Sequence, residues 1–107
     1  KVNGRITRDE NMADIAGLGL ARAALVTAQP AGGAEADKAF YHGWAQVWAQ
    51  QVSVDEAQRR SLQDVRAPGP WRSNGPIMQQ GAFGSAFGCK PGTPMQPKPE
   101  QRVSIFP

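Results

Sequence analysis

The stretch that decides the fold is residues 7–28, TRDENMADIAGLGLARAALVTA. It opens on Thr7 with Glu10 three residues later, the capping-box pattern in which the Thr side chain accepts an early backbone N–H and the Glu side chain reaches back. Small and apolar residues then recur every three or four positions, at Met12, Ala16, Gly19, Leu20 and Ala23. We therefore predict a helix from about Thr7 to Ala28, whose small face lets another helix approach closely.

Two further helices are predicted in the middle of the chain. The first, from about Ala34 to Gln51, has the strongest core signal of the sequence. Its apolar stripe consists of Ala36, Phe40, Gly43, Trp44, Val47 and Trp48. A second capping box at residues 53–56, SVDE, opens a short helix. That helix should end near Gln63, because Pro68 disfavours helical geometry in the residues before it.

The C-terminal part is punctuated by glycine and proline. Residues 67–76, APGPWRSNGP, have the turn formers of an irregular loop, a kind of segment that often carries functional side chains. A last short helix is expected at residues 79–87, followed by an extended tail over residues 89–107 in which residues 103–106 are the one strand-like run. The predicted fold class is mainly α, with three to four helices plus an extended Pro-rich C-terminal tail.

The composition predicts a thin core. Leu, Ile, Val and Phe make up 19 of the 107 residues, whereas Gly and Pro make up 21. Such a segment should need packing against a partner surface for its stability, and that surface could belong to another chain or to the rest of its own chain. No apolar run approaches the roughly 20 residues of a membrane helix, so no membrane span is expected. A net charge of +3 is the only argument for nucleic-acid binding, and because the lysines and arginines are scattered we expect no nucleic-acid partner.

Two carboxylates of the first predicted helix share a face. Glu10 and Asp14 are four residues apart, about one helical turn, so they point towards one neighbour. Spacing alone favours a structural explanation, in which Glu10 completes the capping box and Asp14 lies in solvent near the positive end of the helix. The sequence around the two residues supplies a second explanation.

That sequence, ENMADIAGL at residues 10–18, resembles the E-N-x-A-D-x-x-G-L signature of the neprilysin family of zinc endopeptidases. Further matches follow in the same order at Phe40-Tyr41, residues 44–48 (WAQVW), Asp64, Pro68-Gly69, Arg72, Asn74-Gly75, Phe83, Phe87, residues 90–92 (KPG), Met95 and Arg102-Val103. The resemblance implies that residues 1–107 are the C-terminal segment of a thermolysin-like zincin catalytic domain, with a tail more similar to that of bacterial members. Residues 1–4 contain neither an initiator methionine nor the apolar stretch of a signal peptide, so we expect the segment to begin inside a longer protein.

The resemblance also implies a catalytic zinc ion. Glu10 would be its third protein ligand, and two histidines of an H-E-x-x-H helix in the missing upstream part would supply the others. Asp14 would accept the far N–H of a zinc-bound histidine and so fix its tautomer and orientation. The one histidine of these residues, His42, is interpreted as incidental, so the segment alone should not assemble a zinc site.

Residues 64–72 would lie on the substrate side in this family. Asp64 begins a segment that usually reads Asp-x-His, in which the histidine donates to the oxyanion of the tetrahedral intermediate; here Arg66 takes its place. Asp64 would orient Arg66, although a loop-stabilising salt bridge explains the two residues nearly as well. Arg72 would hold a substrate backbone carbonyl, and the alternative is a surface arginine stacked on Trp71.

The leading interpretation is a zinc metalloendopeptidase that hydrolyses peptides outside the cytoplasm. The runner-up is a non-catalytic, peptide-binding relative, because the longer side chain of Arg66 need not place an N–H where the histidine would. The expected partners are peptide substrates and the remainder of its own chain. By itself the segment should be inactive and should self-associate through its uncovered apolar stripe.

Overall fold

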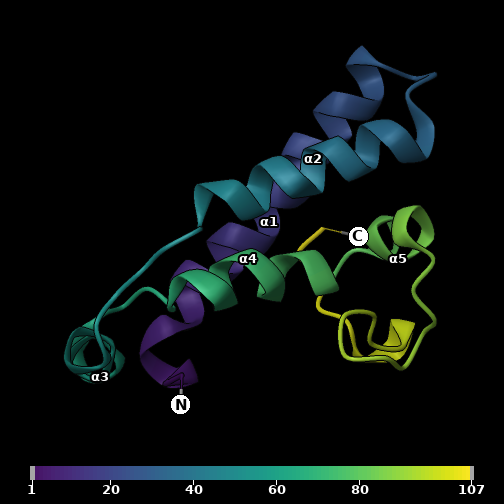
Figure 1. The fold of residues 1–107 in the computed structure, drawn as a ribbon. Helices are drawn as coiled ribbons and strands as arrows, with labels where there is room; N and C mark the ends of the chain where they lie inside the picture. Colours follow the sequence, from purple (N-terminus) through teal and green to yellow (C-terminus); the bar gives the residue numbers. More distant parts are fainter. Residues whose placement is uncertain (1, 107) are drawn as a thin grey trace.

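The computed structural model describes residues 2–106 as a set of helices joined by short connections (Figure 1). The elements are α1 (Gly4–Ala28), α2 (Gly33–Val47), α3 (Val54–Gln63), α4 (Gly69–Met78), α5 (Gly81–Phe87) and the 3-10 turn η1 (Pro99–Gln101). Within that described part, the β-type pairing is limited to an isolated bridge between Thr93 and Gln96. The predicted mainly α class is confirmed, with one α-helix more than predicted.

Helix α1 begins three residues earlier than predicted. Its N-cap is Asn3, whose side chain accepts a hydrogen bond from the Arg5 backbone N–H at 3.1 Å. Thr7 is buried inside the helix, where its hydroxyl donates to the Asn3 carbonyl (3.0 Å) and accepts from the Asn11 side chain (3.0 Å). The predicted capping box of Thr7 and Glu10 is therefore wrong, because Asn is at least as good a cap and a Thr hydroxyl inside a helix can bond the carbonyl four residues back.

Helix α4 lies at the centre of the packing and contacts α1, α2 and α5. The buried core joins Leu18 of α1, Tyr41 of α2 and Ile77 of α4. Around it pack the partly buried side chains of Phe40, Trp44, Phe83, Phe87 and Met95. Burial raises the pKa of Tyr41 to about 12, and the Tyr41 hydroxyl donates to the Gln80 side-chain oxygen. The one hydroxyl in this core is thus hydrogen bonded, and it ties α2 to the N-cap residue of α5.

Residues 67–76, predicted as an irregular loop, form most of α4. Pro70 lies in the first turn, where a missing N–H is harmless because that N–H would have no helical partner. Pro76 lies inside the helix and leaves the Arg72 carbonyl without its usual donor four residues on. The indole N–H of Trp44 donates to that carbonyl at 3.0 Å. Contact with α2 therefore replaces the hydrogen bond that proline removes, and a local pattern of turn formers does not reveal such a replacement.

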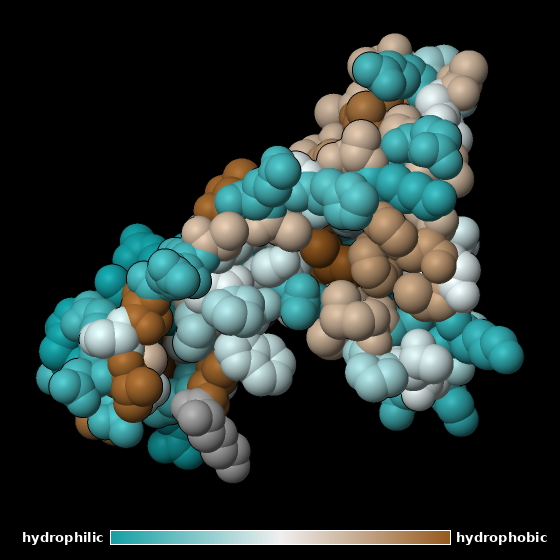
Figure 2. All heavy atoms as spheres, in the orientation of Figure 1, coloured by the Kyte–Doolittle hydropathy of each residue, from teal (hydrophilic) through white to brown (hydrophobic). Residues whose placement is uncertain are grey.

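Helix α3 differs from the others in its surroundings. Ser53 caps α3 as predicted, because its side chain accepts a hydrogen bond from the Glu56 backbone N–H at 3.2 Å. Helix α2 ends at Val47 rather than at the predicted Gln51, so a linker separates it from α3. In the described part of the chain no other helix packs closely on α3, and Figure 1 shows it set apart. Val54 and Leu62 are 72% and 77% exposed, and Figure 2 shows apolar residues uncovered at this end of the molecule.

Side chains attach the C-terminal tail to α4 and α5. Gln96 is buried against Gly84, where a Cβ would overlap the Gln96 side chain, so any larger residue would force Gln96 to move. The Val103 N–H donates to the Gln79 side-chain oxygen at 2.8 Å. The strand-like run at residues 103–106 forms no strand. Across residues 2–106, no helix has the length and apolar character needed to cross a membrane.

Candidate active site

Arg72 of α4 and Asp14 of α1 form a forked ion pair between two helices. Nε and Nη2 of Arg72 donate to the two carboxylate oxygens of Asp14, each at 2.8 Å. Their side chains are only 15% and 12% exposed. The Asp14 hydrogen bonds raise the pKa of Arg72 in spite of its burial, and the charges of Glu10 and Asp64 act in the same direction. Arg72 is therefore a permanent cation held in one place.

Two tryptophans of α2 contact the same arginine. The guanidinium carbon of Arg72 lies 3.8 Å from the centre of the Trp48 ring. The Trp44 indole N–H donates to the backbone carbonyls of Arg72 (3.0 Å) and Ser73 (3.2 Å). Arg72 therefore stacks on Trp48 and not on Trp71, and the alternative of a surface arginine is wrong. The helical spacing of the tryptophans predicted a buried stripe, but nothing in the sequence linked that stripe to Arg72.

Glu10 lies one turn before Asp14 and is partly buried. Because Glu10 and Asp14 are four residues apart on α1, they share a face of the helix, and the charge of Glu10 acts with Asp14 to raise the pKa of Arg72. Among residues 2–106 no group of three or more His, Cys, Asp or Glu side chains could hold a metal ion, and His42 is exposed on α2. The Glu10 carboxylate has suitable donor chemistry for zinc, but this chain offers one such ligand and not a complete site.

The Asp14 and Arg72 side chains keep unused bonding capacity. A carboxylate can accept about four hydrogen bonds, and Arg72 uses two of those of Asp14. A guanidinium has five N–H donors, and Asp14 occupies two of them. Within residues 2–106, Nη1 of Arg72 makes no hydrogen bond. Both groups can therefore bind a further partner without giving up their mutual contact.

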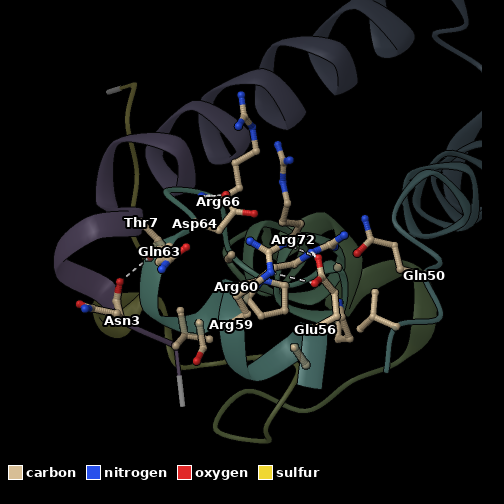
Figure 3. A pocket seen from close by; sticks show the side chains of 18 of the residues that line it. Asn3, Thr7, Gln50, Glu56, Arg59, Arg60, Gln63, Asp64, Arg66 and Arg72 are labelled. Carbon is tan, nitrogen blue, oxygen red and sulfur yellow. Dashed lines mark hydrogen bonds and ion pairs between the residues drawn. The ribbon is translucent and has the colours of Figure 1, made fainter. Parts of the chain in front are cut away.

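A cavity of about 820 Å³ borders Arg72 (Figure 3). The first turns of α1, helix α3 and the segments at residues 50–52 and 63–70 form its walls. The Arg66 backbone N–H donates to the Asp64 side chain at 2.9 Å, while the Arg66 side chain is exposed and makes no ion pair with any described residue. Asp64 thus holds the backbone of Arg66 rather than its guanidinium. Figure 3 shows Arg66 and Arg72 extending in the same direction.

The part of the cavity wall that α3 forms carries a local ion-pair cluster. Arg59 and Arg60 both donate to the carboxylate of Glu56, at 2.7 to 3.0 Å. The hydrogen bonds from Arg59, and then those from Arg60, lower the pKa of Glu56 to about 2. The walls therefore carry more positive than negative charge, which suits a ligand that presents carbonyl or carboxylate oxygens.

The model of peptidase family M13 matches residues 1–103. The chain belongs to this family. It is 31% identical to Neprilysin-2 of Caenorhabditis elegans, over 96% of the chain and 15% of that protein. It is 34% identical to neutral endopeptidase of Lactobacillus helveticus, over 99% of the chain and 16% of that protein. It is 32% identical to endothelin-converting enzyme 1 of Homo sapiens, over 90% of the chain and 14% of that protein. No solved structure matches this M13 chain. The resemblance to the neprilysin family is confirmed, and the chain spans 14 to 16% of the length of these relatives.

Proposed function

We propose that this M13 chain is the C-terminal segment of the catalytic domain of a zinc-dependent endopeptidase and acts together with the remainder of its own chain. The observation that carries the proposal is the fixed cation of Arg72 beside the cavity, with Asp14 and Glu10 on a shared face of α1. Its substrates are peptides, and it works outside the cytoplasm. Family membership and the relatives named neprilysin and neutral endopeptidase support these parts of the proposal.

Glu10 would supply one of three protein ligands to a zinc ion. A zinc ion held there would supply Lewis-acid chemistry for activating water and polarising a peptide carbonyl. Asp14 accepts an N–H from a histidine of the upstream helix with the lone pairs that Arg72 leaves free, and so fixes the orientation of that ring. The partly buried position of Glu10, one turn from Asp14, supports both assignments.

Arg72 holds a backbone carbonyl of the substrate. Asp14 occupies its Nε and Nη2 atoms, which leaves Nη1 free to donate to a ligand, and Arg72 is one of the residues that line the cavity. A donor already fixed by its neighbours loses little freedom when a peptide binds, so it positions the substrate effectively. Arg66 takes the role of oxyanion donor, supported by its place in the lining of the same cavity and by an exposed side chain that pairs with no carboxylate of residues 2–106.

The zinc assignment is tested by measuring bound zinc in the full-length protein. Glu10→Ala should lose the metal, whereas Asp14→Ala should keep part of it and turn over poorly. Asp9→Ala is the matched control, because Asp9 is an exposed carboxylate of the same helix whose one ion pair among residues 2–106 is with Arg8. Normal zinc stoichiometry in the Glu10→Ala protein would refute the assignment.

A non-catalytic peptide-binding relative is the second candidate, because the exposed Arg66 stands where the resemblance leads us to expect a histidine. Loss of one oxyanion donor typically lowers turnover by roughly 10² to 10³. Peptide cleavage by the zinc-loaded full-length protein decides between the candidates. The second candidate wins if that protein is inactive and an Arg66→His version cleaves. The isolated segment should in either case be inactive and should self-associate through exposed apolar side chains. Of the predicted stripe on α2, Val47 is 66% exposed, whereas Phe40 and Trp44 pack around the core.

A further inference from the structure

Arg72 is anchored at three points, and one of them has no role in the function proposed above. Asp14 fixes one edge of the guanidinium, and Trp44 fixes the backbone carbonyl. The third anchor is the ring of Trp48, 3.8 Å from the guanidinium carbon. At that distance the cation lies over the face of the ring, because an edge-on approach requires a larger separation.

A forked ion pair alone leaves the guanidinium one freedom. Both hydrogen bonds to Asp14 lie along one edge, so the group can still tilt about that edge as a hinge. A flat ring against the guanidinium face removes the tilt, because stacking is strongest when the cation stays over the ring centre. The ring of Trp48 thereby fixes where Nη1, the edge that Asp14 does not use, can point.

The surroundings of Trp48 support a role for its ring rather than its N–H. The Trp48 Nε1 atom is buried and has no hydrogen-bond partner in residues 2–106. Trp44, one turn earlier, packs against Trp48 in a T-shaped contact with ring centres 5.4 Å apart, so the Trp48 ring is itself supported. Trp71, the residue adjacent to Arg72 in sequence, is 55% exposed and takes no part.

We propose that Trp48 is a positioning residue, whose ring face fixes the plane of the Arg72 guanidinium so that Nη1 is presented to a backbone carbonyl of a bound peptide. This inference rests on the proposed function, because it assigns Trp48 to the arginine that holds the substrate. A bound carbonyl then meets a donor that needs no reorientation. Loss of the ring should therefore weaken the use of peptide substrates without removing the charge of Arg72.

The test is a double-mutant cycle in the full-length, zinc-loaded protein, with kcat/KM measured on one peptide substrate. Trp48→Leu should lower kcat/KM by about 10- to 30-fold, while Trp48→Phe, which keeps a ring face, should stay within about threefold of the unmodified protein. Trp71→Leu is the matched control and should have less than about a twofold effect. In an Arg72→Ala background, Trp48→Leu should cause no further loss beyond about twofold, because its effect acts through Arg72.

Each other outcome has a definite meaning. An equal loss from Trp48→Leu with and without Arg72 would show that Trp48 supports the fold generally and would overturn the inference. If Arg72→Ala lowers kcat/KM but Trp48→Leu does not, the inference alone fails. If Arg72→Ala has no effect, the substrate role of Arg72 fails, and the inference fails with it. Should the protein bind peptides without cleaving them, the same cycle is measured on the Kd of a peptide by calorimetry, with the same expected pattern.

Discussion

Arg59 of α3 and Arg72 of α4 make the same forked bond with very different consequences. Each donates from Nε and Nη2 to both oxygens of one carboxylate, at 2.7 to 3.0 Å. The partner of Arg59 is Glu56, three residues away, and their side chains are 60% and 31% exposed. The partner of Arg72 is Asp14, 58 residues away on another helix, and these side chains are 15% and 12% exposed. Bond geometry is therefore a poor guide to importance; burial and sequence separation decide whether a pair reinforces one turn or joins two helices.

The largest expected effect comes from Asp14→Asn, which removes the charge that faces a mostly buried guanidinium. Breaking such a pair should lower the free energy of unfolding by about 3 kcal/mol, because Arg72 is left uncompensated. The measurement is urea unfolding of the full-length protein with a chelator present, so that zinc binding does not contribute. Glu56→Gln breaks the same fork on α3 and should leave the urea midpoint unchanged. Equal shifts in the two variants would contradict the comparison.

Trp44→Phe should have a smaller effect on the same region. The ring still packs, but the carbonyls of Arg72 and Ser73 lose an indole donor, which should cost about 1 kcal/mol. This loss of stability should appear as faster amide hydrogen exchange in α4. Adding Pro76→Ala should restore part of the protection, because residue 76 then supplies a backbone N–H to Arg72. No recovery in the double variant would mean that the proline is not the reason for the Trp44 bond.

Ser53→Ala should affect α3 alone. The Ser53 side chain accepts the Glu56 N–H, and loss of an N-cap typically costs a helix about 1 kcal/mol. Since no other helix packs closely on α3 within residues 2–106, exchange should accelerate in α3 while α4 stays protected. Ser61→Ala is the control, because its hydroxyl only donates to the Gln58 carbonyl within the same helix. Simultaneous loss of protection in α4 would show that the two regions are coupled.

The smallest expected effect is a pH dependence of α3. Contacts with Arg59 and Arg60 lower the pKa of Glu56 from 4.5 to about 2. A lowered carboxyl pKa means that the stabilisation is complete above about pH 4.5 and is lost as pH falls towards 2. The protection factors of the α3 amides, which are the ratios of intrinsic to observed exchange rates, should fall as the pH is lowered through this window. The Glu56→Gln protein should lack this added dependence, and its persistence there would assign the effect to another group.

Local patterns predicted most of the helices, and contacts between distant segments explain what they missed. Periodicity placed α1, α2 and α5, and Ser53 marked the start of α3, because each of these signals lies within about four residues. Helix α4 was missed because the donor that compensates Pro76 comes from Trp44, 28 residues before the carbonyl it bonds. In the same way, Glu10 and Asp14 could be placed on one face from spacing. The link from Asp14 to Arg72 could not, since helix spacing carries no information across 58 residues.

The proline inside α4 also bears on how these sequences can change over time. Pro76 takes away a backbone donor and Trp44 returns one, so Trp44 is costly to replace while the proline remains. Lineages that keep proline at 76 should be held to a donor at 44, and lineages without that proline should be free to vary there. The two positions, on different helices, should therefore be inherited as a linked pair.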